Sequence, residues 1–336
     1  MSDNSILVTG ASGHIGNVLI RQLLAQGKHV RAMILPGEDT TSLHGLDIQK
    51  IIGNVLDSSS LSACFEGVQQ VFHLAGIISI MPGKNPHVQH VNIDGTANVL
   101  AAAKQAGVKR LVYTSSIHAL ARIPHGRIID ESVAYDPENP YGAYDQSKAR
   151  ATLLVQEAAQ AGFDAVIACP TGVIGPYDFR NSMMGDVIRS AALRHVTPYV
   201  DGAYDFVDVR DVAGGLISAA ENGATGASYI LSGHRISVRY LLETVREITG
   251  NGFAQFKIPF PLANFISRFT PFYYRLSNAV PRFTPYSLEV LQSNSFISHA
   301  KASRELGYLP RPIYESVEDT IHWFFEQNRP TRHPAA

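Results

Sequence analysis

The alternation of strand-length apolar runs with helix-period stretches constrains the fold of this chain more than any other feature. Apolar runs lie at 5–10, 29–35, 68–76, 110–116 and 164–170, and helix-period stretches lie at 14–27, 92–106 and 143–161. Strands that are apolar almost throughout are typical of a parallel sheet covered by helices on both faces. The sequence therefore predicts an α/β fold built on a doubly wound parallel sheet.

Composition excludes several classes of protein. The 336 residues are 45% hydrophobic and 17% charged, with a formal net charge of −1. These values indicate a globular chain with a large core and argue against disorder or nucleic-acid binding. His87 and His90 fit no ligand framework, so no metal site is predicted.

Cysteine usage and the N-terminus bear on the compartment. Cys64 and Cys169 lie far apart, without the spacing of a zinc site or a disulfide framework, which favours a reducing environment. The start MSDNSILVTG lacks the pattern of a signal peptide, and no stretch approaches the roughly 20 apolar residues that span a bilayer. We expect a cytoplasmic protein without a membrane span.

A glycine-rich loop follows the first strand. In SILVTGASGHIG, the residues Gly10, Gly13 and Gly16 stand between a strand and a helix. Glycines there permit a tight turn and a close approach of the backbone to a pyrophosphate, whose charge the helix N-terminus attracts. The spacing is a variant of the dinucleotide-binding motif, and its position after the first strand predicts such a site.

The end of the second strand bears on the choice of coenzyme. An acid there binds the ribose 2′-hydroxyl of NAD, whereas an arginine meets the 2′-phosphate of NADP. Leu35 occupies this position, with Arg31 and Lys28 nearby. The lack of an acid favours NADP(H), while NAD(H) stays possible and Arg31 is equally well a solvated strand residue.

A series of short motifs follows the order found in one enzyme family. They are TGASGHIG, NVLD, VFHLAG, VNIDGTANVL, VYTSS, YDQSK, PTGVIGPYD, FVDVRDVA and SRELGYLPRP. With them the chain resembles the extended short-chain dehydrogenase/reductase family over nearly its whole length, and within it the dihydroflavonol 4-reductase and 3-beta-hydroxysteroid dehydrogenase branch. The resemblance implies a Rossmann-type lobe, a bound nicotinamide coenzyme and a Ser/Tyr/Lys catalytic set.

The domain organisation follows from the same pattern. Residues 1–175 are expected to form the dinucleotide-binding domain, and residues 176–336 mainly a smaller substrate-binding lobe. The segment 204–233 is expected to return to the first domain. Helices are predicted near 183–193, 237–249 and 313–327, on either side of a stretch rich in proline and aromatic residues at 253–286.

The expected coenzyme contacts follow the motifs. In the loop they are Gly10, Ala11, Ser12, Gly13, His14, Ile15 and Gly16. After the next strands they are Arg31, Leu35, Val55, Leu56, Asp57, Leu74, Ala75, Gly76, Thr114, Ser115, Tyr144, Lys148, Pro170, Thr171, Gly172 and Val173. The resemblance implies that the neighbourhood of Asp57 contacts adenine and that Ala75 and Gly76 line the coenzyme channel.

Tyr144 and Lys148 have the spacing of a proton-handling pair. Reduction of a carbonyl leaves an alkoxide that must gain a proton. A cation at i+4 on a helix lies beside the phenol and is expected to lower its pKa. The resemblance places the catalytic hydroxyl on Ser116, with Ser115 in reserve, and Asn92 near Lys148. Taken singly, each residue is more often a surface pair, a turn former or a helix cap.

The sequence favours an oxidoreductase with an apolar substrate. The aromatic residues between Phe253 and Tyr274 are expected to form a core that also lines the pocket, although simple packing or a face on a membrane is open. The hypothesis is an NADP(H)-dependent reductase of an apolar or aromatic ketone or aldehyde. The candidate substrate contacts are Ile78, Ser116, His118, Tyr141 and Tyr177.

Two other functions stay open. One is a sugar or nucleotide-sugar epimerase or dehydratase that uses NAD transiently, although no arginine precedes Arg304 in the stretch 287–304 where a diphosphate-binding arginine is expected. The other is a dinucleotide sensor without catalysis, which the presence of Tyr144, Lys148 and Ser116 disfavours. By resemblance, a homodimer is expected through helices 92–106 and 143–161.

Overall fold

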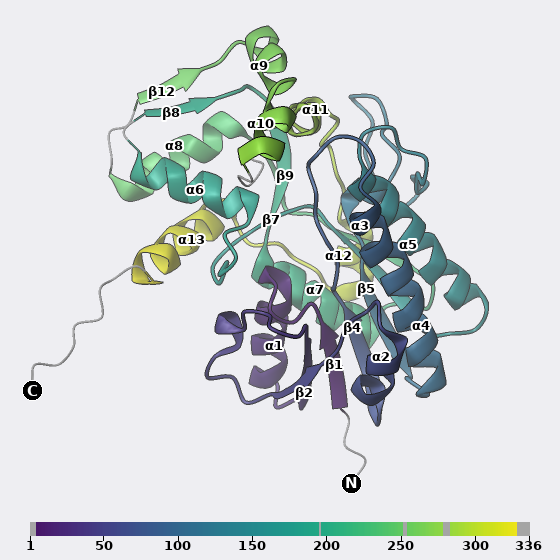
Figure 1. Ribbon diagram of the computed structural model, residues 1–336. Coiled ribbons are helices and arrows are strands. Elements are labelled where there is room, and N and C mark those ends of the chain that lie inside the picture. Colours follow the sequence, from purple (N-terminus) through teal and green to yellow (C-terminus); the bar gives the residue numbers. More distant parts are fainter. Residues whose placement is uncertain (1–4, 195, 251–253, 278–282, 328–336) are drawn as a thin grey trace, which may run out of the picture.

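The computed structural model describes residues 5–194, 196–250, 254–277 and 283–327. Its centre is a parallel sheet of seven strands in the order β10-β6-β5-β4-β1-β2-β3 (Figure 1). These strands are β1 (Ser5–Thr9), β2 (Val30–Ile34), β3 (Gln49–Ile52), β4 (Val68–His73), β5 (Arg110–Thr114), β6 (Ala165–Pro170) and β10 (Ser228–Leu231). The predicted doubly wound α/β fold is confirmed.

Helices cover both faces of this sheet (Figure 1). One face packs against α1 (His14–Ala25) and α7 (Val209–Asn222). The other packs against α2 (Ser58–Phe65), α4 (Gly95–Gln105) and α5 (Ala143–Gln160). Alternate residues of β1 serve the two cores, since Ile6 and Val8 join the first and Leu7 the second. Burial on both faces explains why the strands are apolar throughout.

The sequence did not indicate β3 and α2. β3 reads QKII at the edge of the sheet, with partly or fully exposed side chains, so it lacks the apolar run of a central strand. α2 starts with three serines after the helix-capping Asp57. Both are short elements on one margin of the domain, where little apolar surface needs covering.

A smaller lobe stands beyond the carboxyl edge of the sheet. Its sheet contains β7 (Gly172–Ile174), β9 (Ala203–Asp208) and β11 (His234–Ser237). Its core is formed with α6 (Met183–Leu193), α8 (Val238–Thr249) and α13 (Ile313–Gln327), which lie where helices are predicted. A second pair, β8 (Val196–Tyr199) and β12 (Ala254–Lys257), leads to α9 (Phe260–Ser267), α10 (Thr270–Ser277) and α11 (Pro285–Gln292).

The chain passes between the two lobes more often than predicted. Of the segment 204–233, α7 and β10 belong with the large sheet, whereas β9 belongs to the small one. α12 (Ala300–Leu306) also returns and packs against α7. The small sheet starts at Gly172, slightly before the expected boundary.

A charge cluster fastens α7 to the C-terminal part of the small lobe. Asp208 caps α7 and pairs with Arg210, which also pairs with Asp319 of α13. Asp211 pairs with Arg311 at 2.7 Å. These ion pairs join the two lobes.

The aromatic stretch differs from expectation. Among the residues described, Phe256, Phe265, Phe269 and Phe272 are 60 to 68% exposed, and Phe260 and Tyr273 are also exposed. The expectation of a core lining the pocket is wrong for these side chains, because β12, α9, α10 and the turn between the two helices direct them outward. Phe253 lies outside the described residues. Within the described ranges, no helix is long and apolar enough to cross a membrane.

Candidate active site

The glycine loop closes tightly where β1 passes into α1. Gly10 has a positive φ of 68°, and a Cβ atom there would lie 2.8 Å from the backbone nitrogen of Ala75. A side chain at Gly16 would collide with the carbonyl oxygen of Gly10. The backbone therefore requires glycine at both positions. Free N–H groups at the start of α1 make this end attractive to a diphosphate.

Ser116 and Tyr144 meet at the same edge of the large sheet. Ser116 follows β5 and caps the short helix Ile117–Ala119, where its Oγ accepts from the His118 nitrogen at 3.2 Å. Tyr144 lies in the first turn of α5, which packs against this short helix, and the nearby Ser116 side chain acts to lower the pKa of the Tyr144 phenol. Both residues are buried, with 6% and 8% exposure. The structure thus buries the predicted proton donor and the predicted hydroxyl on neighbouring elements.

Burial controls the acidity of the Tyr144 phenol. Loss of solvation raises the pKa of Tyr144 to about 12, against the opposing effect of the Ser116 side chain, and the Asp145 carboxylate adds to the rise. The expected lowering by Lys148 is wrong for the protein without coenzyme, because burial outweighs any such effect. Tyr144 is therefore a neutral phenol at pH 7, the protonation state of a donor.

Lys148 is directed at the end of β5. Its Nζ donates to the Thr114 carbonyl oxygen at 2.7 Å and lies 3.5 Å from the Tyr113 hydroxyl. Burial lowers the pKa of Lys148 to about 8. The Thr114 hydroxyl is buried and has no hydrogen-bond partner among the described residues. At the carboxyl edge of the large sheet, the Lys148 ammonium group can therefore donate to one more acceptor, and the Thr114 hydroxyl can bind a ligand.

Asn92 positions the surrounding loops. It lies in the π-helical turn His90–Asp94, and its side chain exchanges two hydrogen bonds with the backbone of Ile77 at 2.8 and 3.0 Å. Its amide also donates to Ser147 Oγ at 2.9 Å. A Cβ atom at Gly76 would lie 3.1 Å from Asn92 Oδ1 and 3.7 Å from Lys148 Nζ. Asn92 thus ties the loop after β4 to the helix that carries Tyr144.

Two predicted hydroxyls are engaged elsewhere. Ser115 Oγ lies 2.6 Å from Thr152 Oγ1, beneath α5. Thr171 Oγ1 donates to Asp205 Oδ1 at 2.6 Å. Ser115 is therefore engaged with α5, and the catalytic role of Ser116 stays a prediction. Of the other residues predicted near the end of β6, Pro170 closes that strand, and Gly172 and Val173 lie in β7.

Arg31 does not reach the coenzyme end of β2. Its guanidinium donates to the carbonyl oxygens of Cys64 and Glu66 at 3.0 and 2.8 Å. Its Nε donates to Gln49 Oε1 at 3.0 Å. Arg31 occupies the second position of the strand, whereas Leu35 follows the other end. The prediction that Arg31 contacts the coenzyme is wrong, because these acceptors hold it away from that edge.

A charged pair missing from the prediction stands beside the glycine loop. Glu38 accepts from the Leu35 backbone nitrogen at 2.8 Å and from Ser12 Oγ at 2.5 Å. Arg180, from the loop after β7, donates to Ser12 Oγ at 2.7 Å and pairs with Glu38. One acid and one base therefore lie at the position where the sequence shows only the apolar Leu35.

The same loop folds over the start of α1. His14 Nε2 lies 2.9 Å from the Pro176 carbonyl oxygen, and Asn17 donates to the Tyr177 carbonyl oxygen at 3.2 Å. Tyr177 has a positive φ of 66°, which is unusual for a bulky residue. Its ring lies under the Arg21 guanidinium. Tyr177 thus contacts the coenzyme side, rather than the substrate side where we expected it.

The remaining predicted coenzyme residues line the sheet edge. Asp57 caps α2, and its hydrogen bonds to Ser59 hold the pKa of that carboxyl below its ordinary value. Val55 is buried against Gly95, Leu56 is partly buried, and a side chain at Gly10 would meet the Leu74 carbonyl. Ala11 is fully buried and Ile15 packs on the core. Adenine contacts at Asp57 stay a prediction.

A buried polar network flanks Tyr144 on the other side. The His118 ring lies edge-on to Tyr144 with centroids 6.2 Å apart. Its Nε2 is 2.7 Å from the Tyr204 hydroxyl and its Nδ1 is 3.2 Å from the Tyr286 hydroxyl. Tyr286 donates to Asp145 at 2.6 Å. His118, a predicted substrate residue, is therefore joined by tyrosines that the sequence did not single out.

Burial sets the charge of this network. It lowers the pKa of His118 to about 3 and raises the pKa of Asp145 to about 6. Arg122 lies 3.4 Å from Asp145 and 3.1 Å from Glu289, so the ionised carboxylate has a counter-ion. On the side of Tyr144, the network presents the rings of His118, Tyr204 and Tyr286, which are neutral at pH 7.

The last two predicted substrate residues are more exposed. Ile78 is 73% exposed in the loop after β4. Tyr141 is 37% exposed, and its ring lies under the Arg122 guanidinium. Both flank the approach to the network, although neither contacts Tyr144 through a recorded bond.

Comparison with known proteins places the chain in a family. Residues 6–232 match the model of the NAD dependent epimerase/dehydratase family. The chain belongs to this family. The resemblance predicted from the motifs is thereby confirmed.

Individual relatives cover nearly the whole chain. A sterol demethylase protein B from Methylococcus capsulatus is 33% identical, with 96% of this chain and 98% of the relative covered. A 4-hydroxy-2-methyl-3-oxo-4-farnesyl-3,4-dihydroquinoline-1-oxide ketoreductase from Stigmatella aurantiaca is 30% identical, with 94% of each covered. The crystal structure of gox2253 superposes with a TM-score of 0.85 at 30% identity, covering 97% and 99%.

The residues present fit the dinucleotide that gives the family its name. The glycine loop is packed so closely that no Cβ atom fits at Gly10 or Gly16, which is the tight turn that a dinucleotide-binding loop requires. The unpaired Thr114 hydroxyl and the Lys148 ammonium supply a donor and acceptor set at the sheet edge. Ribose hydroxyls are suited to both groups.

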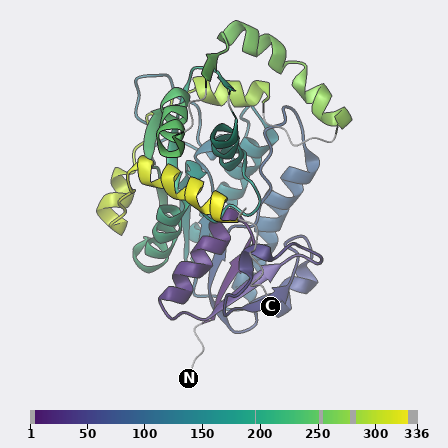
Figure 2. The same ribbon diagram turned by 90° about the vertical axis from the view of Figure 1, so that its left-hand side faces the viewer.

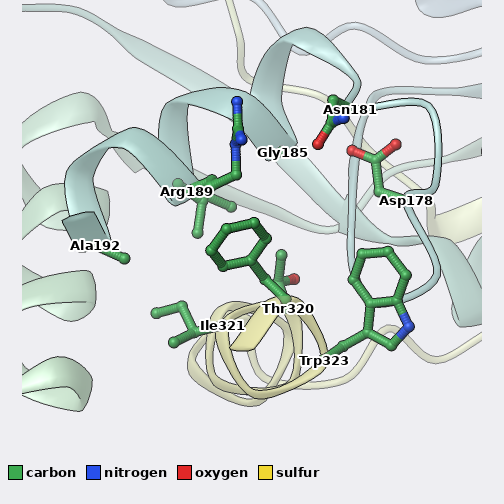
Figure 3. A pocket seen from close by; sticks show the side chains of 10 residues that line it. Asp178, Asn181, Gly185, Arg189, Ala192, Thr320, Ile321 and Trp323 are labelled. Carbon is green, nitrogen blue, oxygen red and sulfur yellow. The ribbon is translucent and has the colours of Figure 1, made fainter. Parts of the chain in front are cut away.

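A separate small pocket lies between α6 and α13 (Figure 3). Two of its charged side chains have partners, since Asp178 accepts from the Ser182 nitrogen and Arg189 pairs with Asp186 through one terminal nitrogen, while Nε of Arg189 has no partner among the described residues. Trp323 and Thr320 line it from α13. It contains none of the residues around Tyr144, so it is not the candidate active site.

Proposed function

We propose that this enzyme is an NAD(P)(H)-dependent reductase of a carbonyl group on an apolar substrate, working reversibly on the alcohol. The coenzyme supplies the hydride. Tyr144 supplies the proton to the developing alkoxide, and Ser116 orients the carbonyl oxygen beside it. Lys148 would bind the ribose of the coenzyme and return a proton to the Tyr144 phenolate after each transfer.

One observation carries this proposal: the Tyr144 phenol and the Ser116 side chain are both buried on elements that pack together, at the sheet edge that also holds Lys148 and the glycine loop. A phenol with a pKa of about 12 stays protonated at neutral pH, so it is set up to donate in the direction of reduction. Alcohol oxidation needs the phenolate, which burial disfavours. A positively charged oxidised coenzyme would lower that pKa.

The network beside Tyr144 supports an apolar or aromatic substrate. His118, Tyr204 and Tyr286 present neutral rings at pH 7, as His118 has a pKa of about 3. The two relatives described above carry names that refer to a sterol and to a farnesylated quinoline oxide, which are largely apolar molecules. By likeness to them, the substrate is proposed to be a hydrophobic ketone.

For the coenzyme, we propose NADP(H) as the preferred form, with Arg180 in the role that the sequence gave to Arg31. Arg180 and Ser12 are already 2.7 Å apart, and a 2′-phosphate accepts from both groups. Glu38 opposes this, because its carboxylate would repel the phosphate and accept from the hydroxyls of NAD instead. The balance between Arg180 and Glu38 then sets the preference.

The experiment is a coenzyme oxidation assay on the purified protein. NADPH or NADH would be supplied with hydrophobic ketones and aldehydes, NAD⁺ or NADP⁺ would be supplied with nucleotide-sugars, and the absorbance of the reduced coenzyme followed. Net oxidation with an apolar ketone supports the reductase. Conversion of a nucleotide-sugar without net oxidation supports the epimerase alternative, in which the coenzyme is regenerated within each turnover.

The expected homodimer and the cytoplasmic location remain proposals. α4 and α5 lie side by side on one face of the large sheet (Figure 1) and pack against each other. Sedimentation of the purified protein would show whether their outer faces also join a second copy.

A further inference from the structure

The helices α9 and α10 carry their apolar residues on the outside. Leu262, Phe265 and Phe269 are 50 to 62% exposed, and Phe272 and Leu276 are 68 and 70% exposed. The spacing of these positions is that of one helical face continued through both helices. We call this surface, formed by the exposed apolar side chains of residues 260–277, the apolar cap.

The inward face of the same helices is small or polar. Ala263 and Ser267 are fully buried. Thr270 Oγ1 donates to the Phe283 carbonyl oxygen at 2.6 Å, and the Phe283 nitrogen donates to the Tyr274 hydroxyl at 3.2 Å. A pair of helices stabilised only by its own core would be arranged the other way, with phenylalanines inside. The inversion indicates that the outward face serves a partner.

The chain segment that carries the apolar cap has basic residues and no acidic ones, although Lys257 pairs with Asp201 from another segment. No Asp or Glu occurs from Ile248 to Leu288, whereas that stretch contains Lys257, Arg268, Arg275 and Arg282. Arg268 and Arg275 are exposed and stand seven residues apart, one in the turn between the helices and one in α10. A partner that covers the cap must therefore accept apolar side chains and positive charge together.

We propose that the apolar cap docks the enzyme on the surface of an anionic lipid bilayer. Aromatic and aliphatic side chains enter the boundary between headgroups and acyl chains, while the flanking arginines stay at the level of the lipid phosphates. The cap suits a flat surface, since α9 stands at the end of the small lobe away from the large sheet (Figure 1), and the green helices of this segment run along the outer margin in the turned view (Figure 2).

Charge disfavours a second copy of the chain as the occupant. A two-fold contact would place the cap against itself and bring the arginines of both copies together, with no acidic residue between Ile248 and Leu288 to balance them. A bilayer with anionic headgroups removes this conflict.

The cap is joined to the active site through α11. α9 packs on α11 through Ala263 and Leu288. Tyr286 of α11 reaches the His118 ring next to Tyr144. Docking would therefore hold the active-site approach near the membrane, where an apolar substrate is concentrated. The docking proposal itself rests on the cap and stands whether or not the reaction is the one proposed above.

The test is flotation of the purified full-length protein with lipid vesicles. Vesicles of phosphatidylcholine alone would be compared with vesicles containing phosphatidylglycerol, and each variant checked for folding by thermal melting. We expect binding to the anionic vesicles, at least roughly tenfold weaker binding to the neutral ones, and weakening by added salt.

Variants locate the contact on the cap. Phe265→Ser with Phe269→Ser is expected to weaken vesicle binding roughly tenfold or more, and Phe272→Ser with Leu276→Ser offers a second pair should the first not fold. Arg268→Glu with Arg275→Glu should abolish the preference for anionic lipid. Leu309→Ser is the matched control, because Leu309 is 84% exposed and lies outside the cap.

Three results would overturn the proposal. The wild-type protein could fail to float with either vesicle, or Leu309→Ser could lose as much binding as the cap variants. The third is a dimer in sedimentation that Phe265→Ser with Phe269→Ser converts to a monomer without any vesicle binding, which would make the occupant a second copy.

Discussion

The edge of the large sheet and the apolar cap differ in which side chains they bury. The sheet edge buries polar side chains, whereas the cap exposes apolar ones. At the sheet edge, Ser116, Tyr144 and Lys148 are buried and joined to partners, and burial shifts the pKa values of the tyrosine and the lysine. At the cap, Phe272 is 68% exposed while Ser267 is fully buried.

The contrast separates two kinds of functional surface. Buried polar groups that are already paired hold a fixed geometry for a chemical step, because rearranging them costs hydrogen bonds. Exposed apolar groups are not fixed by hydrogen bonds to neighbours. They stabilise the protein only when a partner removes their surface from water. Changes at the sheet edge should therefore affect turnover, and changes at the cap should affect location.

Removal of the Tyr144 hydroxyl should have the largest effect. Tyr144→Phe is expected to lower kcat for ketone reduction roughly 10²- to 10⁴-fold, because the alkoxide loses its proton donor. The fold should persist, since the ring stays in place. Steady-state kinetics would measure kcat, and coenzyme titration would check that the dinucleotide still binds. Full activity in this variant would remove Tyr144 from the mechanism.

The two neighbouring serines offer a matched pair with the next largest effect. Ser116→Ala is expected to lower kcat roughly 10²-fold, as the hydroxyl near Tyr144 is lost. Ser115→Ala should instead cost about 1 kcal/mol of unfolding free energy through its bond to Thr152, with kcat nearly unchanged. Kinetics and denaturant melts on both variants would check this. The reverse pattern would make Ser115 the catalytic hydroxyl.

The charged pair at the junction of the lobes should change coenzyme preference. Arg180→Met is expected to lower kcat/KM for NADPH relative to NADH roughly tenfold, and Glu38→Gln to raise that ratio by a similar factor. Activity with the better coenzyme should fall little. Equal effects of both variants on NADPH and NADH would show that the pair does not meet the ribose 2′ position.

The network behind Tyr144 should affect stability more than turnover. Burial raises the pKa of Asp145 from 3.8 to about 6. The folded protein therefore binds this proton more tightly than the unfolded chain, so ionisation of Asp145 costs stability progressively as the pH rises from about 4 to about 6. Asp145→Asn should be more stable than wild type by about 1 to 3 kcal/mol at pH 7, with no difference below pH 4.

Asp130→Asn is the control for that measurement. Hydrogen bonds to Ser132 lower the pKa of the Asp130 carboxyl, so its ionised form adds stability that is lost as the pH falls. Denaturant melts across the pH range should therefore show a gain for Asp145→Asn and none for Asp130→Asn. A loss of stability in Asp145→Asn at pH 7 would mean that the ion pair with Arg122 outweighs the burial of the carboxylate.

The sequence could predict those site residues whose position follows from a single strand or helix. Gly10 and Gly16 follow one strand directly, Ser116 follows another, and Tyr144 and Lys148 share one face of a single helix. The alternation of segments also predicted the large sheet, because each strand buries both faces and so needs an apolar run.

Residues brought together by the small lobe were beyond such reasoning. Tyr204 and Tyr286 reach His118 from positions 86 and 168 residues along the chain, and Arg180 reaches Ser12 across 168 residues. No local pattern encodes contacts of that range. For the cap, helical spacing from Leu262 to Leu276 was present in the sequence, but spacing alone cannot say which face of a helix is turned outward.

Deuterium transfer tests the central claim most directly. Wild-type enzyme would be given a hydrophobic ketone and reduced coenzyme carrying deuterium at the hydride position, and the products analysed by mass spectrometry. The account predicts an alcohol with deuterium on the former carbonyl carbon, formed in step with coenzyme oxidation and lost in Tyr144→Phe. An unlabelled alcohol, or a nucleotide-sugar isomerised in the presence of oxidised coenzyme without net reduction of that coenzyme, would contradict it.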